Sequence, residues 1–153
     1  MSTFDQSLWA DPGFAQEYLD HADHYIPDRH YHFQVLRSFH RAFVARPGGA
    51  RVCDLGCGDG ELLAHLRHTK GVNGYGLESD ADMITRCIEA GVNVLEQDLD
   101  QGLTNFPSDS FDLVVMFDVL EHIEEDVAAL QRVARLLAPG GRLLLTVPAY
   151  PWL

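Results

Sequence analysis

Basic residues are scarce in this chain. Its 153 residues contain 11 Lys and Arg against 23 Asp and Glu, so the formal charge at pH 7 is -12. No more than two basic residues, histidine included, are adjacent, and a surface this acidic repels phosphate backbones and anionic lipids. We therefore expect neither nucleic acid nor a membrane surface among its partners.

Long apolar runs and paired cysteines are missing as well. The first residues have neither the basic nor the apolar stretch of a secretory signal, and no apolar run approaches the roughly 20 residues of a membrane span. The three cysteines, Cys53, Cys57 and Cys87, have no C-x-x-C spacing, which favours small buried thiols in a reducing compartment over disulfides. These absences predict a cytoplasmic protein.

The pattern of the chain changes near residue 48. Residues 1–48 are rich in aromatic residues and histidine, and their apolar spacing predicts helices at 14–24 and 31–46. We expect this segment to form a helical lid and residues 49–153 to form the core, with one domain overall. The histidines have no nearby set of cysteine or carboxylate ligands, so no metal site is expected.

From residue 49 onward, short apolar runs alternate with helical stretches, and Gly, Asp and Asn stand at the joins. This alternation is typical of βαβ units and predicts an α/β fold, a Rossmann-like doubly wound parallel sheet of order 3-2-1-4-5. The strands are predicted at 51–55, 73–78, 92–97, 111–117 and 142–147, and the helices at 61–69, 80–90 and 124–137.

A glycine-rich turn, DLGCGDG, follows the first predicted strand. Its glycines permit positive φ angles and close approach of the backbone to a ligand. Asp54 would repel a dinucleotide pyrophosphate but suits an ammonium group, and Glu61 stands where the dinucleotide fingerprint has its third glycine, which argues against NAD. The candidate ligand contacts here are Asp54, Gly56, Cys57, Gly58 and Gly60.

Acidic residues also end the next two predicted strands, where ligands bind in such folds. Glu78, followed by Ser79, can accept hydrogen bonds from both hydroxyls of a ribose, whereas we expect Asp80 to cap the following helix. Asp98 could accept from the exocyclic amine of adenine while the Leu99 N–H faces a ring nitrogen, although DLD alone is a generic acidic turn.

The fourth predicted strand ends in Phe117 and Asp118, which should border both cofactor and substrate space. His122, four residues on, has the side chain best suited to proton transfer near neutral pH, so it is the candidate catalytic residue. A histidine that only packs against a helix remains the alternative.

Together, these motifs resemble those of the class I S-adenosylmethionine-dependent methyltransferases over residues 51–152. The resemblance implies that Asp54 lies near the methionine amino group, that Glu78 binds the ribose hydroxyls, and that Asp98 with Leu99 holds the adenine. LAPGGRL, before the fifth predicted strand, is similar to the family's turn at that place.

Residues 51–115 resemble MetW-type proteins of methionine biosynthesis in particular, through GDGELLAHL, GYGLESD and GVNVLEQDLDQGL. The later FDVLEHIEEDVAAL and LLTVPAYPWL resemble ordinary small-molecule methyltransferases. The two likenesses imply different functions: methyl transfer to a small-molecule acceptor, or an accessory, non-catalytic subunit that partners an acyltransferase. An NAD-dependent oxidoreductase is the least supported reading.

The resemblance also implies two further strands after the fifth, which this chain does not reach. The apolar fifth strand would then lie at an open edge of the sheet. We expect that edge to be covered either by the further segment of a longer natural chain or by a second copy of the chain or another partner chain.

Overall fold

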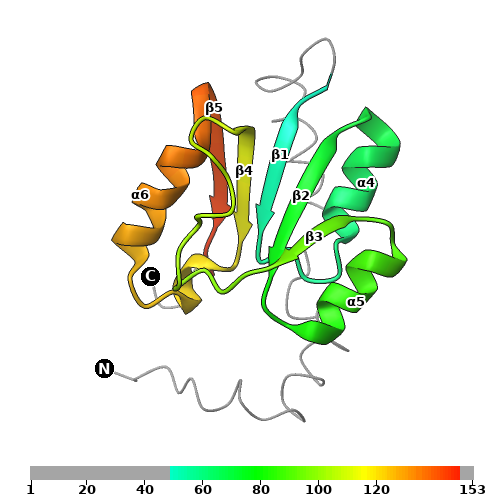
Figure 1. Ribbon diagram of the computed structural model, residues 1–153, viewed down its shortest axis with the longest axis horizontal. Coiled ribbons are helices and arrows are strands. Elements are labelled where there is room, and N and C mark those ends of the chain that lie inside the picture. The colour runs from blue at the N-terminus through cyan, green and yellow to red at the C-terminus, as the bar shows by residue number, and fades with distance from the viewer. Residues whose placement is uncertain (1–48, 149–153) are drawn as a thin grey trace. The chain divides into compact units, whose positions relative to one another are not determined.

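The computed structural model describes residues 49–148, which form a five-stranded parallel sheet of order β3-β2-β1-β4-β5 (Figure 1). This order confirms the doubly wound sheet predicted from the sequence. The elements are β1 (Arg51–Leu55), α4 (Glu61–Lys70), β2 (Asn73–Glu78), α5 (Ala81–Glu89), β3 (Asn93–Glu96), β4 (Phe111–Phe117), the 3-10 turn η3 (Leu120–His122), α6 (Asp126–Leu136) and β5 (Leu137–Thr146).

The two faces of the sheet carry different helices. Leu63 of α4 lies against Gly74 and Gly76 of β2, so α4 covers the face to which these glycines belong. Val133 and Leu136 of α6 pack on the opposite face, in a core cluster with side chains of β1, β2 and β4. Because both faces are covered at the centre, β4 is buried almost throughout, as its apolar sequence predicts.

Most element boundaries agree closely with the sequence. β1, β2 and β4 have the predicted bounds, and α4, α5, β3 and α6 differ from prediction by one or two residues at an end. The η3 turn was not predicted. The predicted lid, residues 1–48 with both of its helices, lies outside the described residues, so its boundary stays a prediction. Within residues 49–148, no helix has both the length and the apolar character needed to cross a membrane.

The start of β5 corrects the prediction. The sequence predicts that Pro139-Gly140-Gly141 separates α6 from a strand beginning at Arg142, but β5 begins at Leu137 and includes this tripeptide. Phe111 pairs with Leu137 and Leu113 pairs with Arg142, so the strand contains an irregularity there. Proline and glycine are tolerated at this point because β5 pairs on one side only among the described strands.

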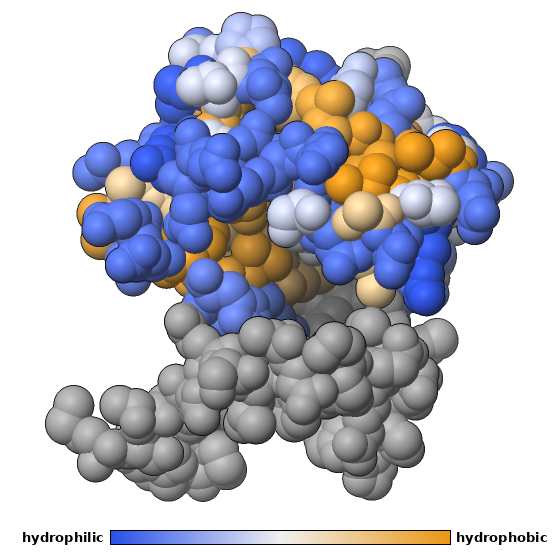
Figure 2. Space-filling view, turned by 60° about the horizontal axis from the view of Figure 1, so that its bottom comes forward, coloured by the Kyte–Doolittle hydropathy of each residue, from blue (hydrophilic) through white to orange (hydrophobic). Residues whose placement is uncertain are grey.

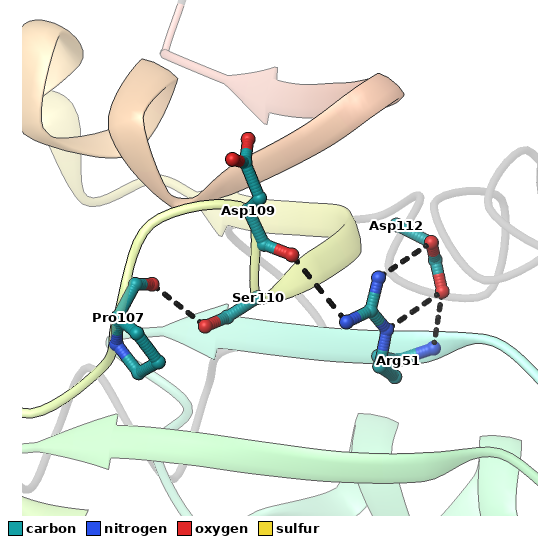
Figure 3. A network of polar contacts seen from close by, with 5 residues as sticks. All are labelled: Arg51, Pro107, Asp109, Ser110 and Asp112. Atoms are coloured by element: carbon teal, nitrogen blue, oxygen red, sulfur yellow. Dashed lines mark hydrogen bonds and ion pairs between the residues drawn. The ribbon is translucent and has the colours of Figure 1, made fainter.

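An ion pair between the exposed Arg51 and the buried Asp112 joins the starts of β1 and β4 (Figure 3). Asp112, whose side chain is 4% exposed, accepts hydrogen bonds from the Arg51 backbone N–H (3.0 Å), Nε (3.3 Å) and Nη2 (3.2 Å). The Nη1 of Arg51 donates to the carbonyl of Asp109 at 3.4 Å. The pair lies at the amino ends of the strands, away from the turns where a ligand is expected, so its role is structural.

Replacing Arg51 tests how much this pair stabilises the fold. Arg51→Met removes the guanidinium and leaves the buried Asp112 carboxylate with fewer donors, so we expect the free energy of unfolding to fall by about 1–3 kcal/mol. Urea denaturation measures it. Arg86→Met, at an exposed position of α5, is the matched control and should change stability by less than about 0.5 kcal/mol. Equal stability of the two variants would contradict the prediction.

Candidate functional site

The glycine turn is attached to β2 by its backbone. The N–H groups of Gly56 and Cys57 both donate to the carbonyl of Leu77, at 2.8 and 3.1 Å, and the Gly60 N–H donates to the carbonyl of Cys57 at 3.0 Å. Gly56 has a φ of +69°, and a Cβ on it would lie 2.5 Å from Val119. Glycine is therefore required at position 56 by both backbone conformation and space.

Gly58 is different because its surroundings are open. Its φ is +54°, but a Cβ placed on it would meet no described atom within 4 Å. Its N–H donates to Oε2 of Glu78 at 2.9 Å. The turn thus presents bare backbone to open space, which is the feature that lets a ligand approach closely.

Glu78, at the end of β2, is half-buried and organises the neighbouring backbone. Its Oε1 accepts from the N–H groups of Ser79 (2.8 Å) and Asp80 (3.1 Å). With the Gly58 bond, three of about four acceptor positions of the carboxylate are used, so at least one remains for a ligand hydroxyl. Asp80 caps α5 as predicted, because its side chain accepts from Asp82 and Met83 backbone N–H groups.

Asp54 is buried beside the turn, with an exposed fraction of 4%. Burial, with a smaller contribution from the Glu78 charge, raises the pKa of Asp54 to about 8. Among residues 49–148, no donor hydrogen-bonds to its carboxylate. A cationic ligand group next to Asp54 would therefore lower this pKa, because its positive charge would stabilise the ionised carboxylate.

At the end of β3, the Asp98 carboxylate is engaged in hydrogen bonds within its own turn. The exposed Asp98 carboxylate accepts from the Asp100 N–H and the Gln101 side-chain amide, both at 2.9 Å, so it closes its own turn. Arg132 of α6 donates to the carbonyl of Leu99 at 3.4 Å, which anchors this loop to the helix. The adenine-binding role of Asp98 and Leu99 stays a prediction.

Asp118, directly after β4, is fixed to β5. It has a φ of +54°, its N–H donates to the Thr146 carbonyl at 3.1 Å, and its Oδ1 accepts from the Thr146 hydroxyl at 3.0 Å. Phe117 before it is half-buried. His122 in η3 has a side chain 46% exposed, with Nε2 at 4.0 Å from Oε1 of Glu121. That exposure gives it access to solvent protons.

The parallel sheet brings these strand ends to one end of the molecule. The arrowheads of β1, β2 and β4 point the same way in Figure 1, and Figure 2 turns that end toward the reader, with mostly hydrophilic residues and hydrophobic patches between them. Direct contacts link Gly58 with Glu78, and electrostatics link Glu78 with Asp54.

The sequence analysis missed three residues that support the candidate site. Val119 lies over Gly56, Thr146 holds Asp118, and Cys87 donates through its Sγ to the Gly58 carbonyl at 3.1 Å. The only usable signal was the expected pairing of the fourth and fifth strands, which places Thr146 beside Phe117.

The chain matches a family model described as "Methionine biosynthesis protein MetW" over residues 38–152. Among curated proteins, it is 30% identical over 114 residues to the bifunctional methionine biosynthesis protein MetXA/MetW of Rhodopirellula baltica, covering 69% of this chain and 18% of that protein. It is 35% identical over 104 residues to a ubiquinone biosynthesis O-methyltransferase of Xanthomonas axonopodis pv. citri, covering 65% of this chain and 44% of the relative.

A mouse tRNA (carboxymethyluridine(34)-5-O)-methyltransferase, ALKBH8, is 31% identical over 135 residues, covering 86% of this chain and 19% of that protein. A solved S-adenosylmethionine-dependent methyltransferase from Mesorhizobium loti shares 31% identity with a TM-score of 0.60, covering 70% of this chain and 50% of the other. The chain spans less than half the length of these curated relatives.

The raised pKa of Asp54 predicts a particular dependence of stability on pH. Between its ordinary value of 3.8 and about 8, the folded protein holds a proton on Asp54 that the unfolded chain releases. The contribution of Asp54 to stability is therefore complete below about pH 4 and falls as the pH rises to about 8. Asp54→Asn keeps the shape but removes this titration.

Urea denaturation between pH 5 and 9 checks this expectation. The stability of Asp54→Asn relative to the original chain should rise with pH and level off above about pH 8. Asp100→Asn, at an exposed position in a loop, is the matched control and should show no such trend. A constant difference between Asp54→Asn and the original chain would show that Asp54 titrates alike in both states.

Proposed function

The chain belongs to the MetW family, within the class I S-adenosylmethionine-dependent methyltransferases, and on that basis we propose that it binds S-adenosylmethionine and transfers a methyl group to a small-molecule acceptor. The observation that carries the proposal is the arrangement around the glycine turn. A buried carboxylate, an open glycine and a second carboxylate with acceptor capacity lie together at Asp54, Gly58 and Glu78.

These groups fit the polar parts of S-adenosylmethionine. Asp54 would pair with the methionine ammonium, Glu78 would accept from the ribose hydroxyls, and Asp98 with Leu99 would receive the adenine. The remaining candidates would line the cofactor with backbone and side-chain atoms. They are Gly56, Cys57, Gly58, Gly60, Ser79, Phe117 and Asp118.

The chemistry required of the protein is modest. When bound, the sulfonium supplies an activated methyl group, so the protein's own residues need mainly to orient the acceptor and exclude water. His122 would accept a proton at an imidazole nitrogen where the acceptor must lose one. Its exposure supports proton release to solvent afterwards.

The proposal of a small-molecule acceptor is based on the net charge of the chain. The relatives include a ubiquinone-pathway enzyme and a tRNA methyltransferase, so similarity alone favours neither class of acceptor. A formal charge of -12 opposes binding of a polyanion to this chain, which supports the small molecule. A cytoplasmic location belongs to the same proposal.

An accessory role is the second candidate. The MetW match and the similarity to a bifunctional MetXA/MetW protein support a subunit that binds the cofactor and partners an acyltransferase. β5 pairs on one side only among the described strands, which offers an edge to a second copy or a partner chain. NAD is disfavoured because Glu61 stands where the dinucleotide fingerprint has its third glycine, and because an ionised Asp54 would repel the NAD pyrophosphate.

Calorimetric titration with S-adenosylmethionine and with NAD tests the cofactor. We expect the first to bind, and Glu78→Ala to weaken its binding by about 1–3 kcal/mol because a charged hydrogen-bond partner is lost. Glu96→Ala is the matched control, since Glu96 is the register partner of Glu78 on β3, and its affinity should be unchanged. Binding of NAD alone, or of neither ligand by a folded sample, would overturn the assignment.

Incubation with a methyl-labelled donor and a panel of small acceptors separates the enzyme from the accessory subunit. We expect label on an acceptor, and less transfer by His122→Ala at unchanged cofactor affinity if the acceptor must be deprotonated. Label on tRNA instead would refute the small-molecule acceptor. Cofactor binding without turnover, together with co-purification of an acyltransferase, would replace the enzyme with the accessory role.

A further inference from the structure

Two thiols from distant parts of the chain meet beneath the glycine turn. Cys57 lies within the turn and Cys87 in the last turn of α5, 30 residues away, yet their Sγ atoms are 3.8 Å apart. Both thiols are free and buried. A disulfide has an S–S distance of about 2.05 Å, so the sulfurs would need to approach by about 1.8 Å.

Two glycines make the space that the thiols occupy. A Cβ on Gly76 would lie 2.4 Å from the Sγ of Cys57, and a Cβ on Gly60 would lie 2.9 Å from the Sγ of Cys87. Real Cβ atoms do not approach sulfur this closely, so any other residue at either position would displace a sulfur. The backbone is thus shaped to hold the two sulfurs side by side.

The same pair is connected to the candidate cofactor site. The Cys87 thiol donates to the carbonyl of Gly58 at 3.1 Å, and the Gly58 N–H donates to Oε2 of Glu78 at 2.9 Å. Joining the sulfurs would remove the thiol hydrogen that the Gly58 carbonyl accepts. It would also draw Cys57 toward α5, and Gly58 is the next residue in the chain.

We propose that Cys57 and Cys87 are a reversible disulfide site whose oxidation weakens binding of S-adenosylmethionine at the glycine turn. The part that concerns cofactor affinity rests on the proposed function, whereas disulfide formation rests on the thiol geometry alone. The expected oxidants are hydroperoxides.

The reaction balances in two steps. The Cys57 sulfur, with 8% of the residue exposed against 0% for Cys87, attacks a peroxide oxygen to give a sulfenic acid and water. The Cys87 sulfur then attacks the Cys57 sulfur, an S–S bond forms, and the hydroxyl leaves as a second water. The two thiols lose two protons and two electrons, and one hydrogen peroxide becomes two waters.

Burial also limits how fast this occurs. Burial, with the nearby charges of Asp54 and Glu78, raises the pKa of both thiols above the ordinary value, so little thiolate is present while the turn is closed. Oxidation is therefore expected mainly when the turn opens. A cofactor that holds the turn closed should therefore slow disulfide formation, because the turn would open less often.

The test uses the full chain, reduced and then exposed to hydrogen peroxide, with free thiols alkylated afterwards. Mass spectrometry should find a peptide pair joined through Cys57 and Cys87 and a loss of two hydrogens, reversed by dithiothreitol. Cys53→Ala is the matched control, because Cys53 belongs to the core cluster and the variant keeps the pair. Cys87→Ala and Cys57→Ser should both abolish the cross-link.

Affinity for S-adenosylmethionine is measured on the same samples. We expect oxidation to weaken binding by about two- to tenfold, the range for losing one hydrogen bond, with full recovery on reduction. Absence of the cross-link, or independent oxidation of each thiol, would overturn the disulfide site. A cross-link with unchanged affinity would overturn its effect on the cofactor.

If the proposed function is wrong but the disulfide site is right, the experiment gives a different result. In that case the reduced protein itself would bind no S-adenosylmethionine, whereas the cross-link would still form and would support the disulfide site. A second readout then tests the turn directly. Amide hydrogen exchange of residues 56–60 should be faster in the oxidised than in the reduced protein, and equal exchange would contradict the coupling.

Discussion

Two backbone hydrogen bonds to one carbonyl determine the geometry of the candidate site. Gly56 and Cys57 both donate to the carbonyl of Leu77, which holds the turn after β1 against the end of β2. The next residue on β2 is Glu78, so its carboxylate meets the Gly58 N–H across the turn. Without that attachment, neither the open glycine nor the carboxylate beside it would have a fixed position.

The turn also lies beside two neighbouring carboxylates, those of Asp54 and Glu78. Asp54 is buried within reach of the Glu78 charge, and burial already favours its protonated form. Keeping a proton avoids two neighbouring negative charges in the free protein. A cationic ligand would favour release of that proton, so ligand binding and proton release should be coupled at neutral pH.

Sequence reasoning predicted those parts of the site that depend on strand order and local motifs. The glycine turn, Glu78 and the Asp80 cap follow from residues close together in the chain, and parallel pairing places them at one end of the sheet. The Asp118 contact with Thr146 spans 28 residues, and the contact between the two thiols spans 30. Such contacts depend on how helices pack and on the register of paired strands. The periodicity of a sequence predicts elements but not these positions.

Val119 lies between the glycine turn and the η3 turn and contacts the first while directly preceding the second. It covers Gly56 so closely that no Cβ would fit, and the η3 turn that carries His122 begins at the following residue. A displacement of η3 therefore changes the support behind the glycine turn, and a displacement of the turn presses back on η3. Under the proposed function, Val119 would therefore connect the cofactor side of the site at Gly56 with the acceptor side at His122.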